Sequence, residues 1–292
     1  MKVLVLGYRG KFNMTERIEE SFKKLGHELV DNNPDFLIHL TGGFQDAQDI
    51  YNKCKIKPVR LYCLLDVDTD KDITWYSQVK KDLEDCEIPC VISETVKTQV
   101  KQILKIEKEI NVVHFPLADE FSFLNYFKTI EFLYSGRVYA KNKNFQLVLE
   151  TLDCLKVSRN SLVVCGTEKG PTETFVDSQP YDIVNKLFNS CRFLLSPSSF
   201  EGTNMNMIQS VITNTFPILN KECQVNYEFG LSEFCAEPTP QAMAKKINEI
   251  VTNEKYYYDI LSELRPILLE KFKLENVVKR IIGLYDAYVK KE

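Results

Sequence analysis

The sequence predicts an α/β protein with two Rossmann-like domains that face each other across a cleft, followed by C-terminal helices. Short apolar runs alternate with amphipathic segments along the whole chain, which is typical of βα units with parallel strands. This pattern starts again after an irregular, aromatic-rich stretch at 117–128, and a length of 292 residues fits two domains. We place the domains at 1–125 and 126–275. The helix at 276–292 is expected to pack back on the first domain.

The first domain begins with Val3–Leu6, an uninterrupted apolar run that predicts a buried strand. A capping pattern at Asn13 and Glu16 begins the next helix, and Gly26 ends it. Further strands are expected at Phe36–Leu40, Leu61–Leu65, Cys90–Ile92 and Val112–Phe115, with helices between them, most clearly at Thr95–Glu109.

The second domain repeats the alternation. Strands are expected at Phe132–Tyr134, Leu162–Cys165, Phe193–Leu195 and around Pro217–Leu219. Helices are expected at Asn144–Leu155, Tyr181–Ser190 and from about Asn206, and then at Pro240–Thr252, Lys255–Lys271 and Glu275–Lys290. Alternation of this kind implies right-handed crossovers and a doubly wound sheet.

Composition and charge are those of a globular, intracellular protein. The chain is 44% hydrophobic and 27% charged, and its net charge of −4 does not favour a protein that coats nucleic acid or an anionic membrane. Its N-terminus turns polar too quickly for a signal peptide, and no apolar run reaches the ~18 residues of a membrane span. We therefore expect no transmembrane segment, no secretion, and a cytoplasmic location in the organism itself or in a host cell.

The cysteines do not indicate a metal or disulfide framework. Nine occur singly, most of them in apolar runs, and there is no CxxC pair. With three histidines in the chain, we expect no zinc site and reduced, buried thiols.

The segment Leu194–Asn220 carries the strongest functional signal. An apolar strand ends in Ser196-Pro197-Ser198-Ser199, and Glu201 and Gly202 follow on a loop before a helix and a second strand. Ligands of open α/β sheets bind at this end of the strands, and helix N-termini there favour anions. An ordinary βαβ unit with a solvated loop glutamate is the alternative interpretation.

A basic loop follows the first strand of the second domain. Gly136 and Arg137 end that strand, and Lys141 and Lys143 follow before the next helix. A bidentate guanidinium and an ammonium together neutralise a diphosphate without a metal. The alternative interpretation is a solvated basic turn.

In their order along the chain, these two segments resemble the donor-site signatures of GT-B glycosyltransferases, in particular the retaining family 4, also called glycosyl transferases group 1. The resemblance is most specific from Phe132 to Asn220. It implies a GT-B fold and an enzyme that moves a sugar from a nucleotide-diphosphate donor, such as a UDP-sugar, to a hydroxyl acceptor. It further implies retention of configuration and no metal or other cofactor.

The resemblance also implies roles for single residues. Arg137 and Lys143 would contact the diphosphate, although Lys143-Asn144 falls one residue later than the commonest Lys-Gly or Lys-Asn spacing, which keeps Lys141 as an alternative. Glu201 would bind hydroxyls of the donor sugar. Gln209 stands eight residues further on, where the family has a ribose-binding glutamate. Backbone groups near the donor are expected at Gly136, Gly166, Gly202, Thr203 and Asn204.

The first domain supplies weaker candidates. Gly7, Arg9 and Gly10 follow the first strand and would lie at the floor of the cleft, near phosphate or acceptor. The family's histidine after the third or fourth strand is missing. Asp66 or Asp68 would then orient the acceptor hydroxyl or act as the base.

The sequence does not identify the acceptor, for which a glycan, a protein, a lipid-linked sugar and a modified nucleobase all stay open. Two other functions also stay open. One is a GT-B nucleotide-sugar epimerase or hydrolase. The other is a non-catalytic nucleotide-sugar-binding protein.

Overall fold

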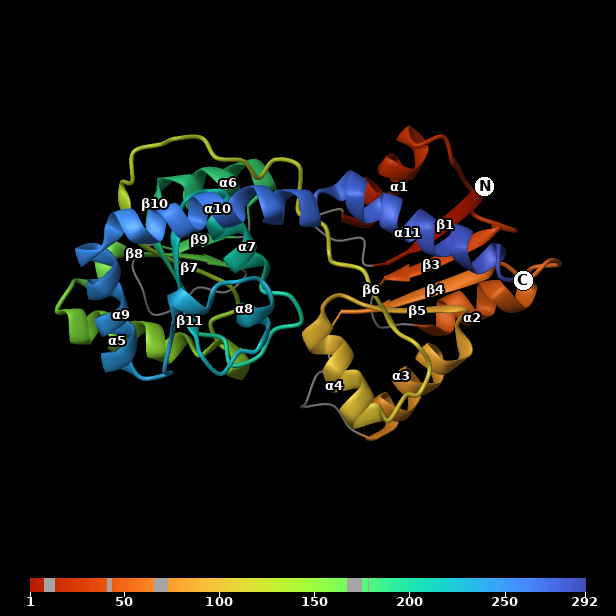
Figure 1. The fold of residues 1–292 in the computed structure, drawn as a ribbon, viewed down its shortest axis with the longest axis horizontal. Coiled ribbons are helices and arrows are strands. Elements are labelled where there is room, and N and C mark those ends of the chain that lie inside the picture. The colour runs from red at the N-terminus through yellow and green to blue at the C-terminus, as the bar shows by residue number, and fades with distance from the viewer. Residues whose placement is uncertain (8–13, 41–43, 66–72, 167–174, 178) are drawn as a thin grey trace. The chain divides into compact units, whose positions relative to one another are not determined.

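Two six-stranded parallel sheets, each with its own helices, make up the protein (Figure 1). The structure is a computed structural model that describes residues 1–7, 14–40, 44–65, 73–166, 175–177 and 179–292. The chain divides into a first unit, Met1–Pro116 together with Lys271–Glu292, and a second unit, Leu117–Glu270. These findings confirm the predicted α/β class with two parallel-sheet domains. The predicted boundaries at 125/126 and 275/276 stay predictions beside the observed divisions at 116/117 and 270/271.

The sheet of the first unit has the strand order β2-β1-β3-β4-β5-β6, and all its pairs are parallel. Its strands are β1 Lys2–Leu6, β2 Glu28–Leu29, β3 Phe36–Leu40, β4 Val59–Leu64, β5 Ile88–Val91 and β6 Asn111–Val112. Its helices are α1 Met14–Lys24, α2 Phe44–Lys53, α3 Ile73–Asp85, α4 Glu94–Leu104 and α11 Leu274–Val289. The order reverses between β1 and β3, as in flavodoxin-like sheets.

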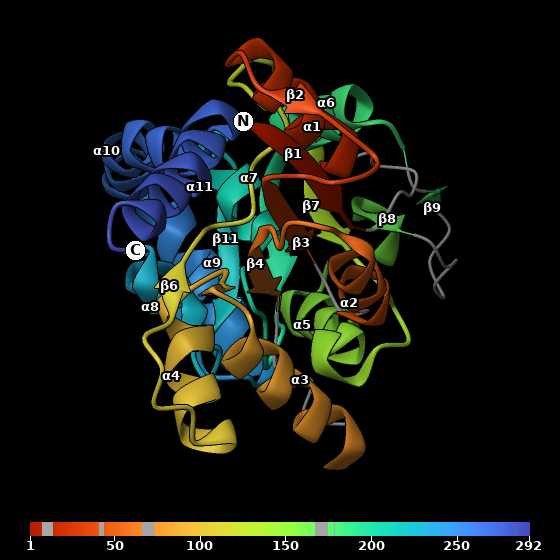
Figure 2. The same cartoon turned by 90° about the vertical axis from the view of Figure 1, so that its right-hand side faces the viewer.

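The C-terminal helix α11 completes the core of the first unit. It packs beside α1 and against β5 (Figure 1 and Figure 2), and Val278 and Ile281 are buried. The ring of Tyr285 lies 4.8 Å from that of Phe36 on β3. The two ends of the chain therefore share one hydrophobic core.

The sheet of the second unit has the strand order β12-β11-β10-β7-β8-β9 and is also parallel throughout. Its strands are β7 Ile130–Ser135, β8 Leu162–Gly166, β9 Phe175–Asp177, β10 Cys191–Ser196, β11 Phe216–Asn220 and β12 Cys235–Ala236. Its helices are α5 Phe145–Leu155, α6 Tyr181–Ser190, α7 Met205–Ile212, α8 Val225–Glu228, α9 Pro240–Thr252 and α10 Glu254–Phe272, the last two residues of which belong to the first unit.

This strand order is that of the Rossmann fold, with its reversal between the central strands β7 and β10. Leu133 lies opposite Leu194 in the register of that pair, and both are fully buried. From here the chain continues from β7 to β8 on one side and from β10 to β11 on the other. The carboxyl ends of β7 and β10 are therefore where a sheet of this order binds ligands.

Two predicted elements are shorter than expected. The helix predicted to reach Glu109 ends at Leu104, because Lys105 adopts a left-handed conformation (φ 53°) that stops it. The strand expected at Val112–Phe115 forms ladder pairs only at Asn111–Val112. Among the described residues, no helix is both long and apolar enough to cross a membrane.

Candidate functional site

Lys143 and Glu201 meet at the carboxyl edge of the second unit's sheet. Lys143 ends a short 3-10 turn, Lys141–Lys143, in the loop after β7, and Glu201 lies in the loop after β10. Their side chains form an ion pair between Nζ and Oε1, with 16% and 14% of the side chains exposed. The structure thus brings together a predicted phosphate ligand and the predicted sugar ligand, at the point where the strand order reverses.

Hydrogen bonds on both sides of Lys143 hold the two loops together. The amide of Ser199 donates to the carbonyl of Asn142 at 2.9 Å, and Asn142 Nδ2 donates to the carbonyl of Phe200 at 3.3 Å. On the other side, Asn144 Nδ2 donates to the carbonyl of Pro197 at 3.1 Å. The position of Glu201 is therefore coupled to that of the basic loop.

A second group of amides supports the loop after β10 from the side of β11. Asn220 Nδ2, at the end of β11, also donates to the Pro197 carbonyl, at 3.2 Å. Asn226 Nδ2 donates to the Asn220 carbonyl at 2.9 Å, and Asn204 Nδ2 donates to Asn226 Oδ1 at 3.4 Å. The three asparagine side chains are buried, where an unpaired polar group would be costly, and their hydrogen bonds avoid that cost. The network therefore holds the loop in place.

Helix α7 begins within the same network. Asn204 is its N-cap, with Oδ1 accepting from the amide of Met207 at 3.3 Å. In the first turn, Asn206 Nδ2 donates to the carbonyl of Ser135, the last residue of β7, at 2.6 Å. The helix is thereby tied to the strand that leads into Gly136 and Arg137. The predicted backbone role of Asn204 at the donor stays a prediction, and capping is the role that its side chain has here.

Two of the predicted glycines fit a close approach of strand ends. The Gly136 amide donates to the carbonyl of Cys165 at 2.9 Å, and Gly136 has a φ of 152°. A Cβ atom at Gly166 would lie 2.3 Å from the Gly136 carbonyl oxygen. Glycine at 166 is therefore required for packing, whatever its relation to a ligand.

The remaining cations of the basic loop are not part of the ion pair. Arg137 and Lys141 are exposed, and neither side chain forms a hydrogen bond or ion pair within the part of the chain that the structure describes. Their charges are available to an anion, but no contact joins Arg137 to Lys143 or Glu201.

Gln209, Gly202 and Thr203 lie near Glu201 in sequence and are buried. The carboxamide of Gln209, on α7, makes no hydrogen bond to any described residue. The amide of Met205 donates to the Thr203 carbonyl at 2.9 Å. Their predicted contacts with ribose, sugar or phosphate stay predictions.

The thiol of Cys223 lies in the surroundings of Glu201. Burial, and then the charge of Glu201, raise the pKa of Cys223 to about 12. The thiol is therefore protonated at neutral pH and serves as apolar packing beside the ion pair.

In the first unit, Gly7 follows β1 at the reversal of strand order. A Cβ atom there would lie 2.7 Å from Thr15 Oγ1 and 3.3 Å from the Leu40 carbonyl oxygen, so glycine permits the end of β1 to pack closely against α1 and the end of β3. Arg9, Gly10, Asp66 and Asp68 fall outside the described residues, and so does the capping residue Asn13.

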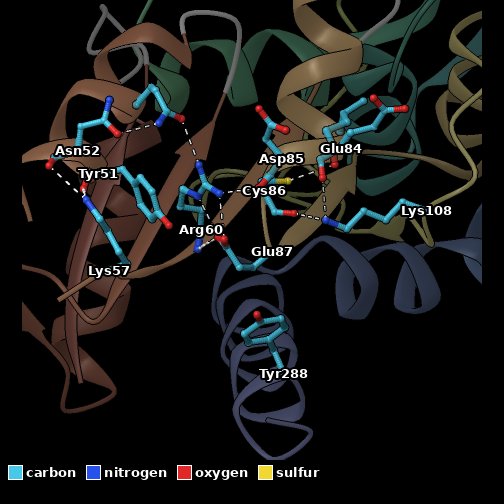
Figure 3. Close-up of polar contacts among 12 residues, drawn as sticks. Tyr51, Asn52, Lys57, Arg60, Glu84, Asp85, Cys86, Glu87, Lys108 and Tyr288 are labelled. Atoms are coloured by element: carbon cyan, nitrogen blue, oxygen red, sulfur yellow. Dashed lines mark hydrogen bonds and ion pairs between the residues drawn. The ribbon is translucent and has the colours of Figure 1, made fainter.

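A different polar cluster, which the sequence did not indicate, surrounds Arg60 at the start of β4 (Figure 3). Its guanidinium donates from Nε and Nη2 to Glu87 at 2.9 Å each, from Nη1 to Gln48 at 3.1 Å, and from Nη2 also to the Asp85 carbonyl at 2.5 Å. The ring of Tyr51 covers the guanidinium, with Cζ 3.9 Å from its centroid. Nearly all the donor capacity of Arg60 is thus used within the protein.

Beside this cluster lies a polar pocket of about 530 Å³, lined by residues of α2, β4 and α3. Its buried carboxylate is Asp82, which accepts from Gln78 Nε2 at 2.6 Å. Burial raises the pKa of Asp82 to about 6. The pocket lies at the amino ends of the strands, whereas open α/β sheets bind ligands at the carboxyl ends, so we place the candidate site in the second unit.

The described residues contain no group of three or more His, Cys, Asp and Glu side chains arranged to hold a metal ion.

The fold is that of the GT-B proteins. No protein-family model matches the sequence, and no curated protein matches it. Many solved structures match the fold, although sequence identity to them is low, at 13–14% for HepE, TarM and a rickettsial glycosyltransferase.

These three structures differ mainly in how much of their own length this chain covers. HepE of Anabaena, solved with UDP and glucose, has a TM-score of 0.75 at 13% identity, over 98% of this chain and 100% of its own. The glycosyltransferase from Rickettsia africae has a TM-score of 0.70 at 14% identity, over 98% and 84%. TarM has a TM-score of 0.69 at 14% identity, over 94% of this chain but 58% of its own. The chain thus spans little more than half the length of TarM and the full length of HepE.

Proposed function

We propose that the protein is a glycosyltransferase that moves a sugar from a nucleotide-diphosphate donor to a hydroxyl acceptor, with retention and without a metal. One observation carries the proposal: the pair of Lys143 and Glu201 at the carboxyl ends of β7 and β10, where the strand order reverses. The presence of UDP and glucose in the HepE structure supports a UDP-sugar as the donor.

In this proposal the cations act on the leaving diphosphate. Negative charge develops there as the glycosidic bond breaks, and fixed positive charges stabilise it. Lys143 has three N–H donors, so it can bind Glu201 with one and phosphate oxygens with the others. Arg137, exposed and unpaired among the described residues, supplies a second cation.

Glu201 accepts hydrogen bonds from hydroxyls of the donor sugar, since an ionised carboxylate has two acceptor oxygens and Lys143 occupies only Oε1. Gln209 offers an unused carboxamide to the ribose, to which it can both donate and accept. We assign the acceptor to the first domain, with Asp66 or Asp68 orienting its hydroxyl.

Titration with a panel of UDP-, GDP- and ADP-sugars tests the donor site directly, with binding followed by calorimetry and products by mass spectrometry. We expect one UDP-sugar to bind, and transfer to survive EDTA. Glu201→Gln and Arg137→Ala should each reduce transfer by about 10²- to 10³-fold, as for the loss of one fixed charge partner of a transition state. Their melting temperatures should stay close to that of the wild type.

Glu150→Gln, on the exposed face of α5, is the matched control and should leave transfer unchanged. Full transfer activity in both site variants would reject the assignment. Release of free nucleotide with an altered sugar, in the absence of acceptor, would instead identify an epimerase or hydrolase. Binding of the donor without turnover against any acceptor would identify a binding protein.

A further inference from the structure

Three asparagine side chains connect the backbone around the basic loop to the backbone before Glu201. Asn142 and Asn144 flank Lys143, and they donate to the carbonyls of Phe200 and Pro197. Asn206 donates to the carbonyl of Ser135, two residues before Arg137. None of the three was predicted as a site residue, and none needs to touch a ligand to make these bonds.

The ion pair cannot hold the loops by itself. A lysine side chain has several rotatable bonds, so the two loops could shift relative to each other while the ammonium stayed bound to the carboxylate. The bonds to the Phe200 and Pro197 carbonyls, by contrast, are made by short side chains and lie within four residues of Glu201. They fix where the carboxylate stands relative to the ammonium.

Position 144 has a second requirement that asparagine meets. Its backbone has φ 49° and ψ 42°, a left-handed conformation that glycine and asparagine adopt most readily. Glycine would satisfy the backbone but has no donor for Pro197. Asparagine satisfies both, and its side chain makes no capping hydrogen bond to α5.

We infer that Asn144, assisted by Asn142 and Asn206, is a positioning residue that holds Lys143 and Glu201 at the separation at which one donor molecule contacts both. The ligand in this inference rests on the proposed function. The linkage between the loops does not, and it can be measured without any ligand.

The variant Asn144→Gly keeps the backbone conformation and removes only the amide. Asn125→Gly is the matched control, because Asn125 also has a positive φ (50°) but is exposed and makes no side-chain hydrogen bond to a described residue. Asn144→Asp, which keeps the shape and loses the donor, is the second variant in case the first does not fold.

The first measurement is hydrogen exchange at the amide of Ser199, which is bonded to the Asn142 carbonyl between the two loops. We expect exchange to become about tenfold faster in Asn144→Gly and to stay unchanged in Asn125→Gly, as local opening follows the loss of one hydrogen bond. Unchanged exchange in both Asn144 variants would overturn the inference.

The second measurement is the affinity for UDP-glucose. Asn144→Gly should weaken it about five- to twentyfold in the wild-type background and have no further effect in Glu201→Gln, because residues that act through one another are non-additive. Full additivity, or faster exchange with unchanged affinity, would contradict a positioning role. If the wild type bound no nucleotide sugar, the proposed function would fail, while the exchange experiment would still decide whether Asn144 links the loops.

Discussion

Each unit of the molecule holds a cation and a carboxylate against its parallel sheet, but at opposite ends of the strands. In the second unit, Lys143 and Glu201 lie beyond the carboxyl ends of β7 and β10. In the first unit, Arg60 lies at the amino end of β4, and Glu87 immediately precedes β5 (Figure 3). Open α/β sheets bind ligands at the carboxyl ends of their strands, which is where the pair of the second unit lies.

The two pairs also differ in how completely their hydrogen-bonding capacity is used. All three guanidinium nitrogens of Arg60 donate hydrogen bonds, and Tyr51 covers the group. Lys143 has one bond to Glu201, and unpaired cations follow β7 on the same loop, as far as the described residues extend. A saturated ion pair stabilises the fold, whereas an unsaturated one next to available charges is suited to bind a ligand.

The largest expected effect is on stability, from Arg60→Met. It leaves Glu87 largely buried without its partner, and breaking a buried pair costs about 3 to 5 kcal/mol. Lys143→Met should cost less, about 1 to 3 kcal/mol, because one side-chain hydrogen bond is lost there, whereas Arg60→Met removes four. Urea titration, with hydrogen exchange at β4 amides for the first unit and at β10 amides for the second, measures the difference. Equal losses in the two variants would remove the distinction between the pairs.

Gly166→Ala should destabilise the second unit by about 1 to 3 kcal/mol, since the added Cβ overlaps the Gly136 carbonyl. Gly283→Ala, inside α11 with no atom within 4 Å of the new Cβ, should instead stabilise the first unit by up to about 1 kcal/mol. Thermal unfolding of both variants checks the signs. A Gly166→Ala protein as stable as the wild type would show that the strand ends can separate freely.

Asp82→Asn should stabilise the first unit at pH 7.5 by about 2 kcal/mol. Because burial raises the folded-state pKa of Asp82 from 3.8 to about 6, ionisation of the carboxyl is costly in the folded protein. The contribution of Asp82 to the stability of the wild type is therefore fully present below about pH 4 and is lost as the pH rises through about 6. Urea midpoints measured across this pH range should converge for the two proteins at the acid end. A difference in urea midpoint that did not change with pH would show that the ionisation of Asp82 is not its cause.

The smallest effect is expected from Lys141→Ala, with less than about a threefold loss in donor affinity. Lys143 rather than Lys141 contacts Glu201, and an exposed ammonium is screened by salt and lacks the bidentate geometry of the Arg137 guanidinium. Lys143→Ala should have a much larger effect. Calorimetry with a UDP-sugar at low and high salt compares the two. A larger loss in Lys141→Ala than in Lys143→Ala would identify Lys141 as the residue that binds phosphate and would contradict a role of the Lys143–Glu201 pair in donor binding.

The apolar pattern of the sequence predicted most of the fold. The helices at Tyr181–Ser190 and Pro240–Thr252 have the predicted bounds, and Thr239 caps the second of them by accepting from the Ala242 amide at 3.3 Å. The short strands β2, β9 and β12 were not predicted. They have two or three residues each, which is too short for an apolar or alternating pattern to be recognised in the sequence.

The sequence placed Lys143 and Glu201 in one site through the order of their motifs, but it did not predict the residues that support them. Asn142 and Asn206 donate to carbonyls 58 and 71 positions away, and an asparagine in a loop carries no sign of a partner so distant. The same holds for Arg60. It lies within an apolar strand, and Glu87 is 27 positions further on.

The route of the chain also affects the order in which the protein is built during synthesis. Residues 117–270 form the second unit as one uninterrupted segment, whereas the first unit includes 271–292. Phe272 and Val278 belong to the first unit's core and are made after all of the second unit. The second unit can therefore finish folding while the first, though most of it leaves the ribosome earlier, still lacks α11. Until then, the surface that α11 covers is available to chaperones.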